Sequence, residues 1–380
     1  MILAIAVAGL AAWIYLIAAR GFFWRMEIEP PAQAASRPRV VAVVPARNEA
    51  EVIGQSLRSL LDQDYPEPLT VVLVDDHSED GTARIADSTA AALRARERLK
   101  IVRAQALPAG WTGKVWAMAE GLAEVKAHHG GAEFVLFTDA DIAHARDNLA
   151  GLVARAEAYR LDMVSLMVRL RCQSWVERAV VPAFVFFFRM LYPFAWVNDP
   201  GHRLGAAAGG CMLVRLSALE RIGGMAAIRG ALIDDCALGR RIKRVGPIFL
   251  GLTDRAWSLR GYPKASDAFA MIARSAFTQL DHSLPLLSAT VLAMGIAYVA
   301  PPLLAILASG SAGILGLLAW IAMAFAYRPS LGFYDRSWLW GLALPAIALF
   351  YLAATLESAR RYWLGRGGHW KGRVQAGSGA

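Results

Sequence analysis

Cysteines are few in this sequence, and they form no paired arrangement. The three cysteines, Cys172, Cys211 and Cys236, are far apart along the chain. A disulfide framework and a structural zinc site both need paired cysteines at short or regular spacing, so the sequence argues against both. A scattered, odd set of thiols indicates a reducing compartment.

Charge is also scarce, and it is absent from long stretches. Charged residues make up 19% of the chain and hydrophobic residues 56%. Residues 1–19 and 337–356 carry no charged side chain, and residues 283–327 have no acidic, basic or histidine residue. A helix of about 20 apolar residues crosses the hydrocarbon core. We therefore expect a transmembrane helix at 1–24 and about three at 283–356, with a turn near residues 308–311. A cleaved signal peptide is the alternative for the first run, although no basic segment precedes it.

The basic residues beside these runs predict an orientation. Arginines at positions 20, 25, 37 and 39 follow the first run, so the positive-inside rule places the middle of the chain in the cytoplasm. One crossing before this region and three after it would put the tail, residues 357–380, outside. That tail is nevertheless basic at positions 360, 361, 366, 371 and 373. Either one apolar run is re-entrant or interfacial, or the tail breaks the rule.

The net charge of +9 indicates anionic partners. A membrane surface and phosphorylated substrates both fit this charge, and the chain contains no recognisable nucleic-acid-binding module.

Between these apolar ends, residues 38–170 alternate short apolar runs with amphipathic segments. We expect strands at 40–44, 70–74, 101–102, 134–137 and 163–168, and helices at 49–61, 81–94, 114–128 and 147–159. This alternation predicts an α/β fold, with a parallel sheet covered by helices on both faces. In such sheets ligands bind beyond the carboxyl ends of the strands.

Residues 179–197 differ from this pattern because they are rich in aromatic rings around a single arginine, Arg189. Helices that combine aromatic and basic side chains settle at membrane surfaces, so we expect an interfacial aromatic helix here. A core helix is the alternative.

Pairs of carboxylates stand at the expected ends of strands and at a helix start. Asp139 and Asp141 follow the apolar run 134–137, and Asp75 and Asp76 follow the run 70–74. Mg²⁺ and Mn²⁺ prefer oxygen ligands, often one or two carboxylates together with the phosphates of a substrate. Acids at such positions also cap helices and turns, which is the alternative explanation for each pair taken alone. The same holds for Asp234 and Asp235, where the helix dipole stabilises acids.

Taken together and in order, these segments resemble the family 2 glycosyltransferases, whose GT-A fold has a Rossmann-like mixed sheet. The resemblance covers residues 38–280. It is carried by VPARNE at 44–49, VDDHS at 74–78, GKVWA at 113–117, TDAD at 138–141, GGCMLVR at 209–215 and DDxxLxxR at 234–241. Segments 107–117 and 134–141 look most similar to the bacterial hopanoid-biosynthesis-associated glycosyltransferases, with similarity also to ceramide glucosyltransferase-like enzymes.

This resemblance implies an activity and a location. The chain would be an inverting, metal-dependent enzyme of the inner membrane, with several transmembrane helices and a cytoplasmic catalytic domain. It would transfer a sugar from a nucleotide-sugar, UDP-linked, to a lipid acceptor such as a hopanoid. The family also implies a motif Gln-x-x-Arg-Trp, of which residues 271–275 retain only Arg274. Since that motif is typical of processive members, its loss favours transfer of a single sugar.

The resemblance also implies roles for matching residues. Asp235 would be the general base that deprotonates the acceptor hydroxyl, with Asp234 beside it. Asp141 would hold Mg²⁺ or Mn²⁺ against the diphosphate. The nucleotide-sugar would be bound by the remaining matching residues, which are Pro45, Arg47, Glu49, Asp75, Asp76, Lys114, Asp139 and Arg274.

Other functions fit parts of the same pattern. A polyprenyl phosphate is a second candidate acceptor. A membrane scaffold that has lost catalysis is another reading, but it leaves the full set of carboxylates without a purpose. A nucleotidyltransferase would explain the paired acids of the sheet but not Asp234 and Asp235.

Overall fold

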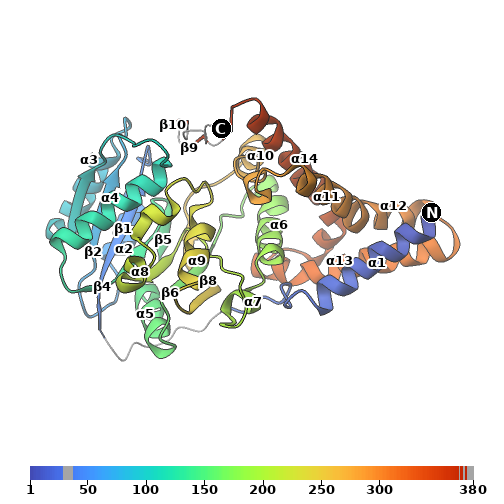
Figure 1. Cartoon of the computed structure of the whole chain (residues 1–380), viewed down its shortest axis with the longest axis horizontal. Helices are drawn as coiled ribbons and strands as arrows, with labels where there is room; N and C mark the ends of the chain where they lie inside the picture. The colour runs from blue at the N-terminus through green and yellow to red at the C-terminus, as the bar shows by residue number, and fades with distance from the viewer. Residues whose placement is uncertain (29–36, 368, 371–372, 375–380) are drawn as a thin grey trace. The chain divides into compact units, whose positions relative to one another are not determined.

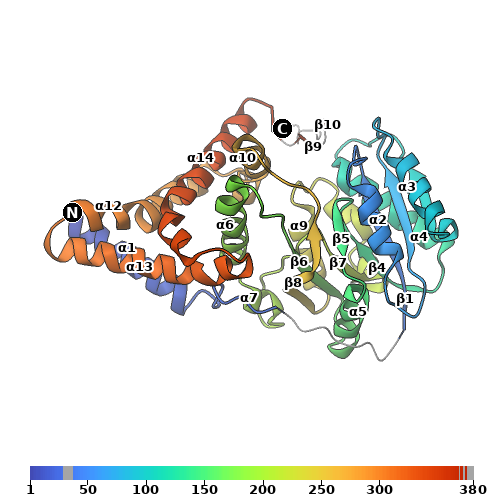
Figure 2. The same cartoon turned by 180° about the vertical axis from the view of Figure 1, so that it is seen from behind.

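The computed structural model describes residues 1–28, 37–367, 369–370 and 373–374, the last four by their backbone alone. Part of the basic tail expected at 357–380, including Lys371, therefore lies outside the described residues. The chain divides into two compact units, which are labelled by element in Figures 1 and 2. We call Met1–Met26, Cys172–Trp196 and Gly261–Gly368 the helical unit, and Glu27–Arg171, Val197–Arg260 and His369–Ala380 the sheet unit.

The sheet unit is built on a mixed sheet of eight strands, in the order β3-β2-β1-β4-β7-β6-β8-β5. Strands β1 to β4 are parallel, β7 is antiparallel to both β4 and β6, and β5 is antiparallel to β8. The strands are β1 (Arg39–Ala46), β2 (Thr70–Asp75), β3 (Leu99–Arg103), β4 (Ala132–Phe137), β5 (Ile142–His144), β6 (Met163–Arg169), β7 (Met212–Arg215) and β8 (Ile248–Ser258). The α/β prediction is confirmed, as is the mixed sheet that the resemblance implied. The wholly parallel sheet expected from the alternation is wrong, because β7 and β5 pair antiparallel with their neighbours.

Helices cover both faces of this sheet. Alternate residues of a strand point to opposite faces, so Val40 and Val44 pack in one cluster with Leu57 and Leu60 of α2. Val43 faces α4, whose Gly121 has no room for a side chain beside it. The helices of the unit are α2 (Ile53–Leu61), α3 (Thr82–Ala92), η1 (Arg96–Arg98), α4 (Gly113–His128), α5 (Asn148–Ala158), α8 (Leu216–Arg221), η2 (Gly224–Ile228) and α9 (Asp234–Lys243). Near the C-terminus β9 (His369–Trp370) pairs with β10 (Arg373–Val374).

The helical unit contains three helices that are long and apolar enough to cross a membrane, Leu284–Leu307, Gly310–Phe333 and Trp338–Trp363. Their number matches the three or so helices expected at 283–356, and the chain turns between Leu307 and Gly310 as expected. That each of them crosses a membrane stays a prediction. The helices of this unit are α1 (Ile2–Ala18), α6 (Trp175–Leu191), α10 (Ala265–Ala273), η3 (Thr278–Leu280), α11 (Leu284–Met294), η4 (Gly295–Val299), α12 (Ala300–Leu307), α13 (Gly310–Phe333), η5 (Trp338–Ala343) and α14 (Leu344–Trp363), while α7 (Phe194–Asn198) lies where the chain passes between units.

The apolar segment Trp338–Trp363 is bent rather than straight (Figure 2). Its first part, η5, runs back along α13, where Trp320 Nε1 donates to Leu342 O at 3.2 Å. Its second part, α14, leads to the segment before α11, where Phe277 N donates to Ser358 Oγ at 3.0 Å. The segment therefore begins beside the end of α13 and ends beside the start of α11.

The aromatic segment at 179–197 is not one helix at a surface. It is interrupted after Leu191, because Pro193 lacks an N–H and disfavours a helical conformation in the residue before it. Phe186 and Phe187 are only 1% and 9% exposed and pack inside the helical unit. For these rings the expected contact with headgroups is wrong, and the core alternative fits. Apolar side chains of the same unit supply enough neighbours to bury them.

Candidate active site

The ends of β1 and β2 form the first part of the site. Asp76 follows β2 and is fully buried. Arg47 Nη1 donates to the backbone oxygen of Asp76 at 2.5 Å and lies 3.7 Å from its carboxylate. Asp75 accepts a hydrogen bond from Ser78 N at 3.2 Å, so it shapes the turn, and Pro45 lies within β1. Arg47 and Asp76 thus lie together at the carboxyl edge of the sheet, where ligands of such folds bind.

An arginine that sequence reasoning missed joins two expected site residues. Arg260, just past β8, donates from Nε to Asp141 Oδ2 at 2.9 Å, and its Nη2 makes a short contact with Glu49. The bonds hold Asp141 beside the β1 loop. The only signal in the sequence is a basic residue after an apolar strand, and β8 was not expected as a strand.

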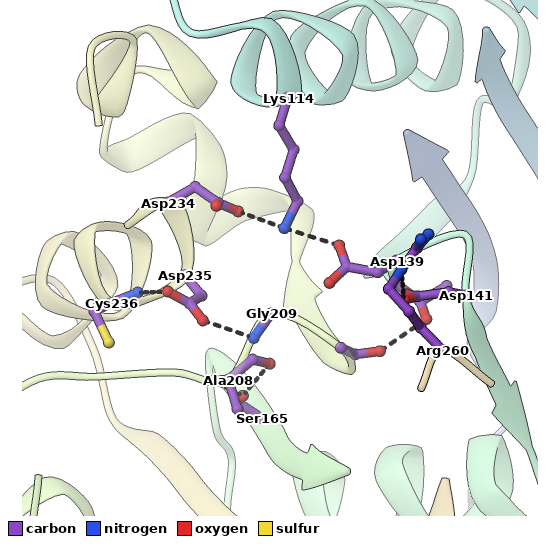
Figure 3. A network of polar contacts seen from close by, with 12 residues as sticks. Lys114, Asp139, Asp141, Ser165, Ala208, Gly209, Asp234, Asp235, Cys236 and Arg260 are labelled. Carbon is purple, nitrogen blue, oxygen red and sulfur yellow. Dashed lines mark hydrogen bonds and ion pairs between the residues drawn. The ribbon is translucent and has the colours of Figure 1, made fainter. Parts of the chain in front are cut away.

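Lys114 connects two of the carboxylate pairs, as Figure 3 shows. It lies in the first turn of α4, and its Nζ is 2.8 Å from Asp139 Oδ1 and 3.1 Å from Asp234 Oδ2. Burial alone would lower the pKa of Lys114, but Asp139, Asp234 and Asp235 together raise it. The lysine is therefore a permanent cation that joins the turn after β4 to the start of α9.

Asp235 lies beside this ion pair, and its carboxyl group is a weaker acid than that of an ordinary aspartate. Its Oδ2 accepts from Gly209 N at 2.9 Å and its Oδ1 from Cys236 N at 2.7 Å. Burial, with the negative charge of Asp234 as the next cause, raises the pKa of Asp235 to about 6. A Cβ at Gly209 would stand 3.3 Å from both Asp235 Oδ2 and Lys114 Nζ, so any larger residue there would crowd the carboxylate and the lysine.

A buried histidine supports the loops around these acids. His144 Nδ1 lies 2.9 Å from Asn148 Nδ2, and His144 Nε2 lies 2.9 Å from Thr138 Oγ1, which donates to Gly210 O at 2.8 Å. Burial lowers the pKa of His144 to about 4, so the ring is neutral at physiological pH. The chain of hydrogen bonds fixes the turn that carries Asp139 relative to the loop that carries Gly209. Sequence reasoning missed this network because its members come from four segments, namely the turn after β4, β5, the start of α5 and the loop before β7.

The site can be tested for its fit to a divalent cation. Among the described residues no group of three or more His, Cys, Asp or Glu side chains stands close enough to hold a metal alone. Mg²⁺ commonly takes only one or two carboxylates and completes its shell with substrate phosphates and water. Asp141 and Asp139 lie on one turn and are already ion-paired, with Arg260 and Lys114 respectively. Either carboxylate would supply only part of a cation's shell, so cation binding would depend on the diphosphate.

The structure brings most of the expected residues together within the sheet unit. Lys114 pairs with Asp139 and Asp234, and both Lys114 and Asp235 lie next to Gly209, so the four side chains form one cluster. Arg274 is different, since it ends α10 and belongs to the helical unit.

The mixed sheet and the position of this cluster define a GT-A-like fold, and comparisons with known proteins agree with that fold. Residues 41–223 match the model of glycosyl transferase family 2. A mannosyltransferase from Pyrobaculum calidifontis, solved in complex with GDP-Man and Mn²⁺, has a similar structure, with a TM-score of 0.57, 22% identity, and coverage of 94% of this chain and 99% of that one. At this identity the likeness establishes the fold. No curated protein matches this sequence.

Two further solved structures are similar at lower scores. They are S. aureus TarS 1–349 with UDP-GlcNAc, at a TM-score of 0.41, 16% identity and coverage of 86% and 92%, and mannosyl-3-phosphoglycerate synthase from Rubrobacter xylanophilus, at 0.41, 19% identity and coverage of 70% and 86%.

From the ion pairs of Lys114 we predict that removing this cation destabilises the fold, by an amount that depends on pH. Lys114→Met leaves Asp139, Asp234 and Asp235 close together without a counter-charge, and breaking such a pair costs roughly 3–5 kcal/mol. Protonation relieves the repulsion, so the loss in melting temperature should be larger at pH 8 than at pH 5. Lys126→Met, which removes an exposed partner of Glu220, is the control and should change little at either pH. Equal losses at both pH values for Lys114→Met would show that the lysine acts by shape alone.

Proposed function

We propose that this protein is a membrane-anchored glycosyltransferase of family 2. It transfers one sugar from a nucleotide-sugar to a lipid acceptor, with inversion at the anomeric carbon. The observation that carries the proposal is Asp235, a carboxylate with a pKa raised to about 6, placed beside Lys114 and the acids of the turn after β4. The family match over residues 41–223 supports the same activity.

The proposed reaction assigns a proton transfer to Asp235. Its carboxylate accepts the proton of the acceptor hydroxyl while that oxygen bonds to the anomeric carbon and the bond from this carbon to the diphosphate oxygen breaks. A base with a pKa near 6 is ionised at neutral pH and more basic than an ordinary aspartate. The N–H groups of Gly209 and Cys236 fix the orientation of the carboxylate.

The donor site is proposed at the ends of β1, β2 and β4. Asp75 and Asp76 hold the nucleoside, with Arg47 bonded to Asp76, and Asp139 contacts the ribose. Asp141 would hold Mg²⁺ or Mn²⁺, which would supply positive charge to the leaving diphosphate. The sequence resemblance favours a UDP-linked donor. Because the Pyrobaculum calidifontis enzyme was solved with GDP-Man and Mn²⁺, GDP-linked sugars should be assayed as donors together with UDP-linked sugars.

The acceptor is proposed to be a lipid of the membrane that holds the helical unit. Three long apolar helices support a membrane location. The resemblance of residues 107–117 to hopanoid-associated enzymes makes a hopanoid alcohol the first acceptor to assay. The proposed location is the inner membrane, with the sheet unit in the cytoplasm.

The bend in Trp338–Trp363 supports a topology that reconciles the charges at both ends of the chain. We propose that α1, α11–α12 and α13 cross the bilayer and that η5 and α14 form a re-entrant hairpin. The hairpin starts where α13 ends and finishes beside Phe277, before α11 begins. Both points lie on one side, because α11–α12 and α13 run in opposite directions on either side of a short turn. Arg360, Arg361 and Arg366 then share the side of Arg20 and Arg25, as the positive-inside rule requires.

The general-base assignment predicts both a rate and a pH profile. Asp235→Asn should lower kcat by roughly a hundredfold or more, while the KM for the donor changes little. For the unaltered protein, kcat/KM should rise with pH and level off above about pH 6, because only ionised Asp235 accepts a proton. Asp234→Asn should move this limb to lower pH, since Asp234 raises the pKa of Asp235.

Transfer of radiolabelled sugar into membrane lipid measures these effects. Asp254→Asn, an exposed position on β8, is the matched control and should keep full activity. Near-normal turnover of Asp235→Asn would assign the base to another group.

The cation assignment predicts a metal-dependent change in nucleotide affinity. Asp141→Ala should remove the part of UDP or GDP affinity that depends on Mn²⁺, because the cation loses its protein ligand. Calorimetric titration with and without Mn²⁺ measures this part directly. Asp147→Ala, which removes a carboxylate paired with Arg255, should leave it intact. A Mn²⁺ effect that survives Asp141→Ala contradicts the assignment.

The topology predicts that the tail and the sheet unit face the same compartment. Fluorescent-protein fusions after Ala380 should fluoresce and alkaline-phosphatase fusions there should be inactive, as expected for the cytoplasm. A fusion in the turn after Leu307 should give the opposite pair of signals. Matching signals at both positions would mean that Trp338–Trp363 crosses the membrane.

A further inference from the structure

An open cavity of about 540 Å³ lies in the helical unit, where the chain passes from α13 to η5. Its apolar walls come from Trp24, Phe325 and Trp338, and its lining also includes Arg328 and Arg336. This volume is in the range of pockets that bind small molecules or lipid headgroups. No residue of the candidate active site lines it.

The walls of the cavity are held in place by contacts within the unit. Trp24 Nε1 donates to Ile17 O at 3.0 Å, and its ring centroid lies 5.2 Å from that of Phe325. Arg336 Nε donates to Tyr334 O at 2.7 Å, which fixes its guanidinium and leaves its other N–H groups available. The cavity is therefore preformed.

The two arginines that line the cavity have no carboxylate partner among the described residues. Over the described part of the chain, neither Arg328 nor Arg336 forms an ion pair with a carboxylate, and Arg328 is exposed. Arg25 adds a further cation, since its guanidinium lies 5.5 Å from the Trp24 ring. Guanidinium groups bind phosphate in a bidentate way, so the site is complementary to a phosphate group.

An apolar track leads along α13 to this cavity. Ile314, Leu317, Leu318, Ile321 and Phe325 are all about half exposed or more and recur at helical spacing, so they form one stripe. The stripe ends one turn before Arg328. Exposed apolar side chains followed by arginines match a lipid, whose chains are apolar and whose phosphate stands at the membrane surface.

Ordinary anchoring at the membrane surface also places tryptophan and arginine near helix ends. Anchoring does not need a preformed cavity in which two arginines and two tryptophans converge. We propose that this cavity binds the phosphate of an anionic bilayer phospholipid, with the acyl chains along the stripe of α13. The proposal depends on the membrane location but not on the transferase chemistry.

The test compares lipid retention by the full-length protein purified in detergent. Native mass spectrometry with an equimolar mixture of phosphatidylglycerol and phosphatidylcholine should show phosphatidylglycerol retained selectively. Arg328→Gln with Arg336→Gln should weaken that retention roughly tenfold or more, because each removes a charge-assisted contact. Arg244→Gln with Arg366→Gln removes the same net charge from other exposed positions and should leave retention unchanged.

Three results would overturn the site. The first is that Arg328→Gln with Arg336→Gln retains as much phosphatidylglycerol as the unaltered protein. The second is that both double variants lose it to the same extent, and the third is that the unaltered protein does not prefer phosphatidylglycerol. If Arg328→Gln with Arg336→Gln raises the KM for the acceptor but leaves phosphatidylglycerol retention unchanged, the cavity is assigned to the acceptor lipid instead. If the double variant melts early, Arg328→Gln alone carries the same test. Sugar transfer is measured separately, so failure here leaves the proposed reaction standing.

Discussion

The arrangement of the site depends on the ion pairs of one lysine. Lys114 extends from the first turn of α4 and binds carboxylates from the turn after β4 and from the start of α9. Without that cation, the mutual repulsion of Asp139, Asp234 and Asp235 would push these segments apart. With it, three carboxylates share one partly buried site, and burial raises the pKa of both Asp139 and Asp235. Burial and the neighbouring charge of Asp234 raise the pKa of Asp235, and Lys114 limits that rise while it keeps the three carboxylates together.

The parallel half of the sheet could be predicted from the sequence because its signals are local. The runs at 40–44, 70–74 and 134–137 are continuous and apolar, and each is followed by a helical pattern. The helix expected from residue 49 starts at Ile53 instead. Residues before it donate to the neighbouring loop, as Ala50 N does to Asp80 Oδ2 at 2.9 Å. Helical periodicity does not reveal such a competing bond.

The rest of the sheet and of the candidate site could not be predicted, because it depends on contacts between segments that are distant in sequence. Strands β7 and β8 pair with strands far away in sequence. They lie outside the regular alternation of strand and helix patterns that predicted the other strands. Arg260 reaches Glu49 across more than half of the chain, so its partners could not be read from spacing. The ring-rich segment at 179–197 has the composition of a surface helix, but Trp13, Tyr298 and Tyr327 lie in the same buried cluster. Whether a ring faces lipid or protein depends on those partners.

The bond from Trp320 to Leu342 has a consequence for the proposed hairpin. A chain that reverses inside hydrocarbon exposes carbonyl groups at the bend, and each one left unsatisfied there costs several kcal/mol. The indole N–H of Trp320, reaching from α13 at 3.2 Å, supplies a donor at that depth. Trp320 thus ties η5 to α13 close to the point where η5 gives way to α14. In the proposed hairpin the bond also fixes the register of the two segments, because sliding η5 by one turn along α13 would break it.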